Sequence, residues 1–170
     1  MIKYKTILAD PPWDEHGGGK IKRGADRHYK LMKTKDIIAM KDWINMIAEN
    51  DCHLYLWTTN NFLPDSLIVM KEWGFKYITI ITWLKDRIGL GQYFRGVTEH
   101  CLFGRKGMLP YKIKEGKRQQ GITGFFECKT FHSQKPIRMH EMIEKVSYPP
   151  MIELFARSDR PGWDAWGKET

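Results

Sequence analysis

The most informative segment of this sequence is TILADPPW, residues 6–13. Its first four residues form a compact apolar run that predicts a buried strand, and Asp10 follows at once. Pro11 and Pro12 cannot donate to a strand ladder, so the strand ends there. In open α/β sheets, ligands bind beyond the carboxyl ends of the strands. Asp10 therefore stands where a functional side chain is expected.

Outward from this strand, short apolar runs alternate with helical patterns. Further strands are predicted at residues 53–57, 77–83 and 151–156 and inside 97–107, and helices at 34–50, 64–74 and 137–146. Two polar, basic stretches at about 14–33 and 111–124 show no period and are predicted to be mobile loops. The alternation indicates a single α/β domain over residues 1–170, with a sheet packed between helices.

Composition limits the partners and the compartment. The net charge of +8 favours a polyanion such as nucleic acid, because Lys and Arg that neutralise phosphates release counterions. Cys52, Cys101 and Cys128 stand far apart without a CxxC pair, which predicts neither a zinc site nor a disulfide framework. No apolar run is long enough to span a bilayer, and the first residues lack the apolar core of a signal peptide. We expect a cytoplasmic protein without a membrane partner.

The residue types in DPPW suit the activation of an exocyclic amine on a base. Such an amine is a poor nucleophile because its lone pair is delocalised into the ring. The Asp10 carboxylate and the Pro11 carbonyl, on a backbone stiffened by Pro12, can accept both amine hydrogens and free the lone pair. Trp13 would offer a ring on which a base taken out of its stack can lie. The plainer interpretation is a strand, a proline turn and a core Trp.

The full DPPW after a short strand resembles the catalytic signature of the MT-A70 family of adenine-N(6) methyltransferases. The resemblance extends along nearly the whole chain, in family order, through HLYLWTT, ITWLK, TEHCLFGRKG, HSQKP, IELFAR and GWDAWG. It implies a Rossmann-like class I methyltransferase fold in permuted order, with the catalytic strand first and the cofactor strand last. It also implies S-adenosyl-L-methionine as the cofactor, no metal, and direct in-line methyl transfer.

The resemblance also assigns residues to roles. It gives catalysis to DPPW, the methionine carboxylate of the cofactor to Lys135, and the ribose to the turn after the last apolar strand. The sequence departs from the eukaryotic pattern at residues 159, 160 and 168, which weakens the ribose and adenine contacts. The cofactor candidates are Asp10, Ser133, Lys135, Arg157, Ser158, Asp159, Lys168 and Glu169. The substrate candidates, mostly in the two loops, are Trp13, Lys20, Lys22, Arg23, Tyr29 and Arg118.

DNA is the preferred substrate over RNA, because a stand-alone chain this short looks more like the prokaryotic or phage branch of the family. A homodimer or a partner subunit is compatible with the resemblance. One alternative is a catalytically silent nucleic-acid-binding subunit, which the intact DPPW argues against and the altered cofactor contacts keep open. A second alternative is cytosine amino methylation, but enzymes of that kind usually carry Ser in place of Asp10.

Overall fold

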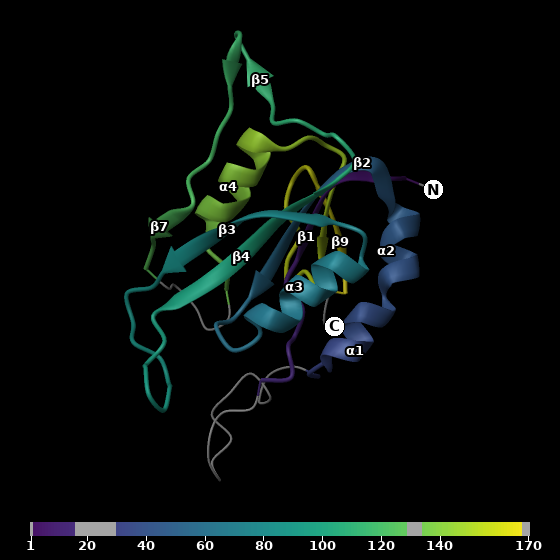
Figure 1. Ribbon diagram of the computed structural model, residues 1–170. Coiled ribbons are helices and arrows are strands. Elements are labelled where there is room, and N and C mark those ends of the chain that lie inside the picture. The colour runs from purple at the N-terminus through teal and green to yellow at the C-terminus, as the bar shows by residue number, and fades with distance from the viewer. Residues whose placement is uncertain (1, 16–29, 129–133, 168–170) are drawn as a thin grey trace.

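The computed structural model describes residues 2–15, 30–128 and 134–167. Within them, seven strands form one sheet in the order β7-β3-β4-β2-β1-β8-β9 (Figure 1). Only β4 runs antiparallel to its neighbours in this sheet. The strands are β1 (Tyr4–Ala9), β2 (Ala48–Thr58), β3 (Lys76–Leu84), β4 (Thr98–Lys106), β7 (Gly124–Phe126), β8 (Met151–Leu154) and β9 (Trp163–Trp166).

Helices cover both faces of this sheet. Ile37, Ile44 and Val69 of the first three helices pack against one face, and Met139 and Ile143 of the fourth pack against the other. The predicted arrangement of a sheet between helices is therefore confirmed. The helices are α1 (Thr34–Ala39), α2 (Lys41–Ile47), α3 (Leu63–Glu72) and α4 (Ile137–Val146). None of the described helices combines the length and apolar character that a membrane span requires.

The strand order agrees with the permuted arrangement that the resemblance implies. β1 comes first in the chain and lies between β2 and β8, with Ala9 in register with Leu56 on one side and Leu154 on the other. Parallel pairing brings the carboxyl ends of these three strands to one edge of the sheet. The residues that follow β1, β2 and β8 therefore meet there.

Some boundaries differ from the sequence predictions. The helix predicted over residues 34–50 is two helices that meet at Met40, and β2 already begins at Ala48. The predicted loop 111–124 contains a hairpin of β5 (Ile113–Lys114) and β6 (Lys117–Arg118). Its turn places Glu115 at φ 51° and Gly116 at φ 70°, a pair of positive φ angles that suits a two-residue hairpin turn. Most of the predicted loop 14–33 lies outside the described residues.

Candidate active site

The DPPW backbone is held by hydrogen bonds at the end of β1. The Asp10 amide donates to the Leu154 carbonyl at 3.4 Å, which ties the motif to the end of β8. The Trp13 amide donates to the Pro11 carbonyl at 2.9 Å, so the chain makes a tight turn around Pro12. A carbonyl oxygen has two lone pairs, and Pro11 therefore keeps acceptor capacity for a second donor.

Trp13 is a core residue in this structure. Its side chain is only 5% exposed, its ring stacks on Phe62 with centroids 5.5 Å apart, and its Nε1–H donates to the Trp57 carbonyl at 3.0 Å. The expectation of an open Trp13 face for a base is not met here, because both its polar atom and most of its surface are occupied inside the protein. Trp13 instead braces the turn that carries Asp10.

Four charged side chains form an alternating chain of ion pairs that ends at Asp10. Lys135 Nζ lies 3.0 Å from Asp10 Oδ2 and 2.6 Å from Glu99 Oε1, and Lys85 Nζ lies 2.6 Å from Glu99 Oε2. We call Lys85, Glu99, Lys135 and Asp10 the ion-pair chain. All four side chains are largely buried. Two cations thus balance two carboxylates in a setting with little water.

Indole rings lie beside both cations. The Lys135 ammonium is 5.2 Å from the centroid of the Trp57 ring, and the Lys85 ammonium is 5.1 Å from that of Trp83. Cations over aromatic faces are attracted by the ring quadrupole. The rings therefore help to hold both lysines in place.

The two carboxylates of the ion-pair chain differ in acidity. Burial raises the pKa of Asp10, with Glu99 adding to the rise while Lys135 and Arg157 oppose it. Burial also acts to raise the pKa of Glu99, but Lys135 and Lys85 outweigh it and hold that pKa at about 2. The pKa of Lys135 is raised, because the attraction of Asp10 and Glu99 exceeds the effect of burial. Lys135 is therefore charged, and Asp10 is the less fully neutralised of the two carboxylates.

Sequence reasoning missed Glu99 and Lys85. Both stand in segments, TEHCLFGRKG and ITWLK, that carried the family resemblance without any role being assigned to a residue in them. A carboxylate in a predicted strand is the signal that was available, since buried charges are normally paired. The partner could not be read from the sequence, because Glu99 and Lys135 belong to distant segments.

The remaining candidates divide into three groups. Arg157, Ser158 and Asp159 are exposed in the turn after β8, where Arg157 is near enough to lower the pKa of Asp10. Arg118 is not brought to the site: its hairpin stands at the end of the molecule opposite the carboxyl end of β1 (Figure 1), and its guanidinium lies over Tyr111. The candidates outside the described residues are Lys20, Lys22, Arg23, Tyr29, Ser133, Lys168 and Glu169.

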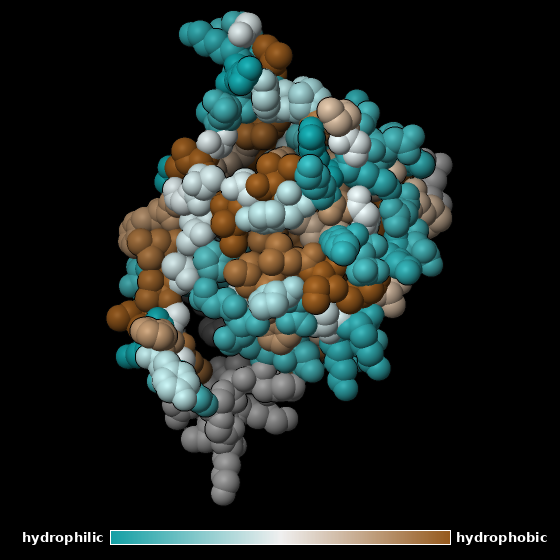
Figure 2. Space-filling model, in the orientation of Figure 1, coloured by the Kyte–Doolittle hydropathy of each residue, from teal (hydrophilic) through white to brown (hydrophobic). Residues whose placement is uncertain are grey.

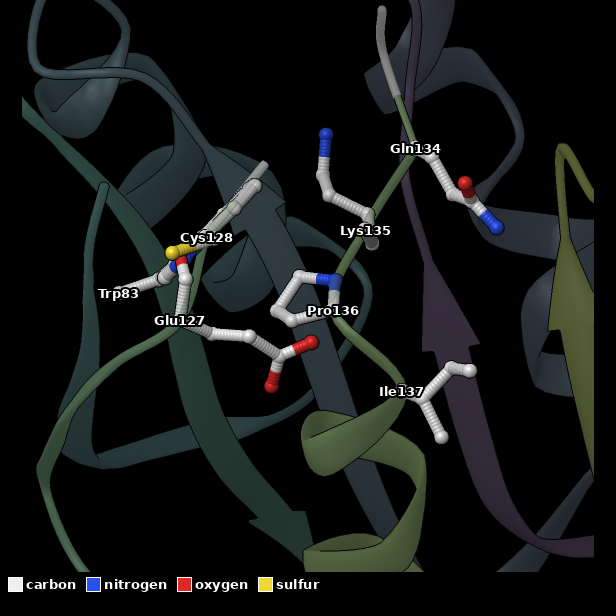
Figure 3. A pocket seen from close by; sticks show the side chains of 7 residues that line it. All are labelled: Trp83, Glu127, Cys128, Gln134, Lys135, Pro136 and Ile137. Atoms are coloured by element: carbon white, nitrogen blue, oxygen red, sulfur yellow. The ribbon is translucent and has the colours of Figure 1, made fainter. Parts of the chain in front are cut away.

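A small pocket adjoins Lys135. Its lining comes from the end of β3, from the residues after β7 and from the start of α4 (Figure 3). Figure 3 shows the Lys135 side chain extending away from Glu127, so its ammonium serves the ion-pair chain rather than this pocket. The lining residues are Trp83, Glu127, Cys128, Gln134, Lys135, Pro136 and Ile137.

The donors at this edge fit S-adenosyl-L-methionine. An ammonium has three N–H donors, and Lys135 directs two of them to Asp10 and Glu99, which leaves one for the carboxylate of a ligand. Within the described part of the chain, Trp57 Nε1 and Thr59 Oγ1 are buried without a hydrogen-bond partner. Buried polar atoms normally have one. These residues give the edge both the charge and the spare polar atoms that a zwitterionic ligand needs.

This sheet, with a carboxylate after its first strand and a buried lysine beside it, has the features expected of a Rossmann-like class I methyltransferase in permuted order. The family model described as MT-A70 matches residues 4–169, and the chain belongs to the MT-A70 family. The fold and the family match both confirm the resemblance seen in the sequence. The chain is by family an adenine-N(6) methyltransferase.

Relatives match almost the entire chain. Type II methyltransferase M.MunI of a Mycoplasma species is 32% identical over 190 residues, covering 98% of this chain and 78% of the relative. The human N(6)-adenosine-methyltransferase catalytic subunit METTL3 is 26% identical, covering 98% of this chain and 28% of the relative. A putative N(6)-adenosine-methyltransferase MT-A70-like protein of Medicago truncatula is 28% identical, with 98% and 26% covered. The chain thus spans about a quarter of these eukaryotic relatives and most of M.MunI.

Proposed function

We propose that this chain transfers a methyl group from S-adenosyl-L-methionine to the exocyclic amino nitrogen of adenine in DNA. The observation that carries the proposal is the Asp10 carboxylate, largely buried after β1 and paired with a lysine that Glu99 holds more closely. A buried carboxylate that is incompletely neutralised is a strong hydrogen-bond acceptor.

Asp10 and Pro11 activate the amine together. One oxygen of the Asp10 carboxylate accepts one amine hydrogen, and the second lone pair of the Pro11 carbonyl accepts the other. The nitrogen releases one of these protons when it gains the methyl group, and the Asp10 carboxylate takes it. The turn around Pro12 fixes these two acceptors before the substrate arrives, so little reorganisation is needed in the transition state. The carboxylate must be ionised, and its raised pKa sets the low-pH limit of the reaction.

Lys135 and Arg157 position the methyl donor. When bound, S-adenosyl-L-methionine supplies an electrophilic methyl group attached to a sulfonium. The third N–H of Lys135 binds its carboxylate, and the exposed turn at Arg157, Ser158 and Asp159 binds its ribose. Ser133, Lys168 and Glu169 remain cofactor candidates on the resemblance alone. Placement of the two reactants within reach of each other lowers the barrier, because the entropy of bringing them together is lost on binding rather than in the transition state.

Charge alone does not choose between DNA and RNA, but the comparison with relatives favours DNA. The net charge of +8 suits a polyanion of either kind. The identity to a bacterial Type II methyltransferase, 32%, exceeds that to the plant and animal adenosine methyltransferases cited above, at 28% and 26%. We therefore place the chain's activity with the prokaryotic branch.

The test is a labelling experiment. The protein is incubated with methyl-labelled S-adenosyl-L-methionine and, separately, duplex DNA, single-stranded DNA and RNA, and the modified nucleoside is identified by mass spectrometry. We expect label on adenine of DNA, retained in Asp164→Asn and lost in Asp10→Ala. Label on cytosine would overturn the assignment of the base, and stronger labelling of RNA that of the polymer. Binding of nucleic acid without any transfer would indicate a silent subunit.

A further inference from the structure

The connection between β3 and β4 carries two adjacent aromatic side chains that solvent almost surrounds. Tyr93 is 93% exposed and Phe94 is 91% exposed, and Ile88 and Leu90 nearby are also exposed. Figure 2 shows hydrophobic side chains at the corner where this connection projects. Exposed apolar surface gathered at one place commonly marks an interaction site.

The aromatic pair sits on a folded turn. The Gly89 amide donates to the Gly96 carbonyl at 2.6 Å, and Arg95 Nε donates to the Gly89 carbonyl at 3.0 Å. A Cβ atom on Gly91 would collide with the carbonyl oxygen of Phe94, so the turn requires glycine at this position. The backbone therefore presents the two rings in a defined way.

The base of this loop joins the ion-pair chain. The Lys85 amide donates to the Val97 carbonyl at 2.8 Å, and the Lys85 side chain pairs with Glu99, which shares Lys135 with Asp10. Figure 1 shows the loop extending beyond the sheet from the edge at which β3 ends. Because β3 and β1 both run parallel to β2, that is also the edge at which Asp10 lies.

We propose that Tyr93 and Phe94 bind nucleic acid by stacking on the bases that flank the target adenine. This inference rests on the proposed function. Reaching an amine inside a stack requires the base to leave it, which exposes the faces of its neighbours. The exposed rings of Tyr93 and Phe94, at the edge of the sheet where Asp10 lies, can stack on those faces. Stacking of a base on an aromatic ring does not depend on the nucleotide sequence. Arg87 and Arg95, both exposed in the same loop, suit the adjoining phosphates.

Charge favours nucleic acid over a protein as the occupant. The loop carries Arg87 and Arg95 against one acidic residue, Asp86, which is 3.7 Å from Arg87. The whole chain is basic as well, with a net charge of +8. A polyanion with flat faces matches both features at once.

The experiment compares Tyr93→Ala/Phe94→Ala with wild type on an oligonucleotide that carries the adenine site found by labelling. A substrate series replaces each flanking nucleotide in turn by an abasic residue, and kcat/KM is measured for each pair. On the intact substrate we expect a loss of about 10- to 100-fold in the variant. At one or two flanking positions, the abasic change should cost wild type a similar factor and the variant almost nothing. Tyr77→Ala/Ile78→Ala, at the amino end of β3, is the matched control and should match wild type.

The outcomes separate the explanations. Equal activity of the variant and wild type, or the same loss in the variant at every abasic position, overturns the stacking proposal while leaving methyl transfer intact. A change of oligomeric state in light scattering, without a position-dependent loss, would show that the loop binds protein. If wild type transfers no methyl group, the proposed function fails. The role of the loop is then tested by the affinity of both proteins for labelled single-stranded DNA, and an unchanged affinity in the variant overturns the stacking proposal.

Discussion

Lys135 lies closer to Glu99 than to Asp10, at 2.6 Å against 3.0 Å. The cation that faces Asp10 is therefore held mainly by another acidic residue, Glu99, which is itself paired with Lys85. This arrangement keeps the positive charge of Lys135 near Asp10 without fully neutralising the Asp10 carboxylate. We therefore predict that Glu99 acts as a positioning residue and that its removal alters the acidity of Asp10.

Glu99→Gln should shift the pH dependence of methyl transfer. The negative charge of Glu99 raises the pKa of Asp10, so its loss lowers that pKa and moves the low-pH limb of the rate to lower pH. Lys135 then pairs with Asp10 alone and competes with the amine, and the plateau rate falls about tenfold, which corresponds to roughly 1.4 kcal/mol. Single-turnover rates across pH measure both effects. Glu127→Gln, which removes a carboxylate from the adjoining pocket, is the control, and an unmoved limb in Glu99→Gln would refute the role.

Asp10→Asn should separate activity from stability. The folded-state pKa of Asp10 is raised, so its stabilising contribution is present below the ordinary pKa of an Asp and is lost as the pH rises through the raised value. At neutral pH, burial of the ionised side chain opposes folding, whereas its attraction to Lys135 favours it, so the amide should leave Tm close to that of wild type. Methyl transfer should fall about 100- to 1,000-fold because one charged acceptor is lost. Calorimetry and initial rates measure the two effects.

Asp164→Asn provides the opposite case. Tyr4 donates a hydrogen bond of 2.6 Å to the Asp164 carboxylate, far along the chain from DPPW. Its replacement should lower Tm and leave the transfer rate nearly unchanged. A fall of both Tm and activity in Asp10→Asn would instead assign Asp10 a structural role.

The sequence predicted the elements whose patterns are local. The α4 helix matches its predicted bounds because its apolar residues repeat at helical spacing, and β1 was marked by the prolines that end it. The β9 strand was missed because its four residues become a strand only by pairing with β8. The start of β2 was missed because polar residues occupy it.

The candidate site was predicted as residues but not as contacts. Asp10 and Lys135 were both assigned to the site, Asp10 to the amine of the base and Lys135 to the carboxylate of the cofactor. That they face each other depends on how the start of α4 packs beside β1, which no local pattern encodes. The same holds for Trp13, whose burial depends on Phe62 and on the Trp57 carbonyl.

Trp13→Phe should test whether the Trp13 side chain stabilises the turn that carries Asp10. Phenylalanine keeps the packing against Phe62 but loses the hydrogen bond to the Trp57 carbonyl, which leaves a buried acceptor unpaired at a cost of about 1–3 kcal/mol. Tm and the transfer rate should both fall, while affinity for nucleic acid stays the same. Thermal unfolding and fluorescence anisotropy measure these quantities, with Trp166→Phe as the control at a more exposed ring. Weaker nucleic-acid binding at an unchanged Tm would restore Trp13 as a base-stacking residue.

A buried network on β2 predicts how stability depends on pH. His53 Nε2 lies 2.9 Å from the Leu109 carbonyl, which can only accept, so this nitrogen carries the proton of the neutral ring. His53 Nδ1 then accepts from the Ser147 hydroxyl at 2.7 Å, and Ser147 Oγ accepts from Tyr55 at 2.7 Å. Burial lowers the pKa of His53, although the Leu109 carbonyl opposes the shift. The network is therefore built around a neutral histidine.

Because the folded-state pKa of His53 is lowered, its contribution to stability is present above the ordinary value of 6.5 and is lost as the pH falls through the folded-state pKa. Tm should therefore drop between pH 7 and pH 5, and His53→Gln should flatten that slope.

At neutral pH, Ser147→Ala leaves both His53 Nδ1 and the Tyr55 hydroxyl without a partner and should cost roughly 2–4 kcal/mol of stability. Tyr55→Phe removes only one donor and should cost about 1 kcal/mol. Denaturant titrations of both variants measure the difference. If Tyr55→Phe costs as much as Ser147→Ala, the serine does not join the two side chains as described, because its bond to His53 should survive in the Tyr55 variant.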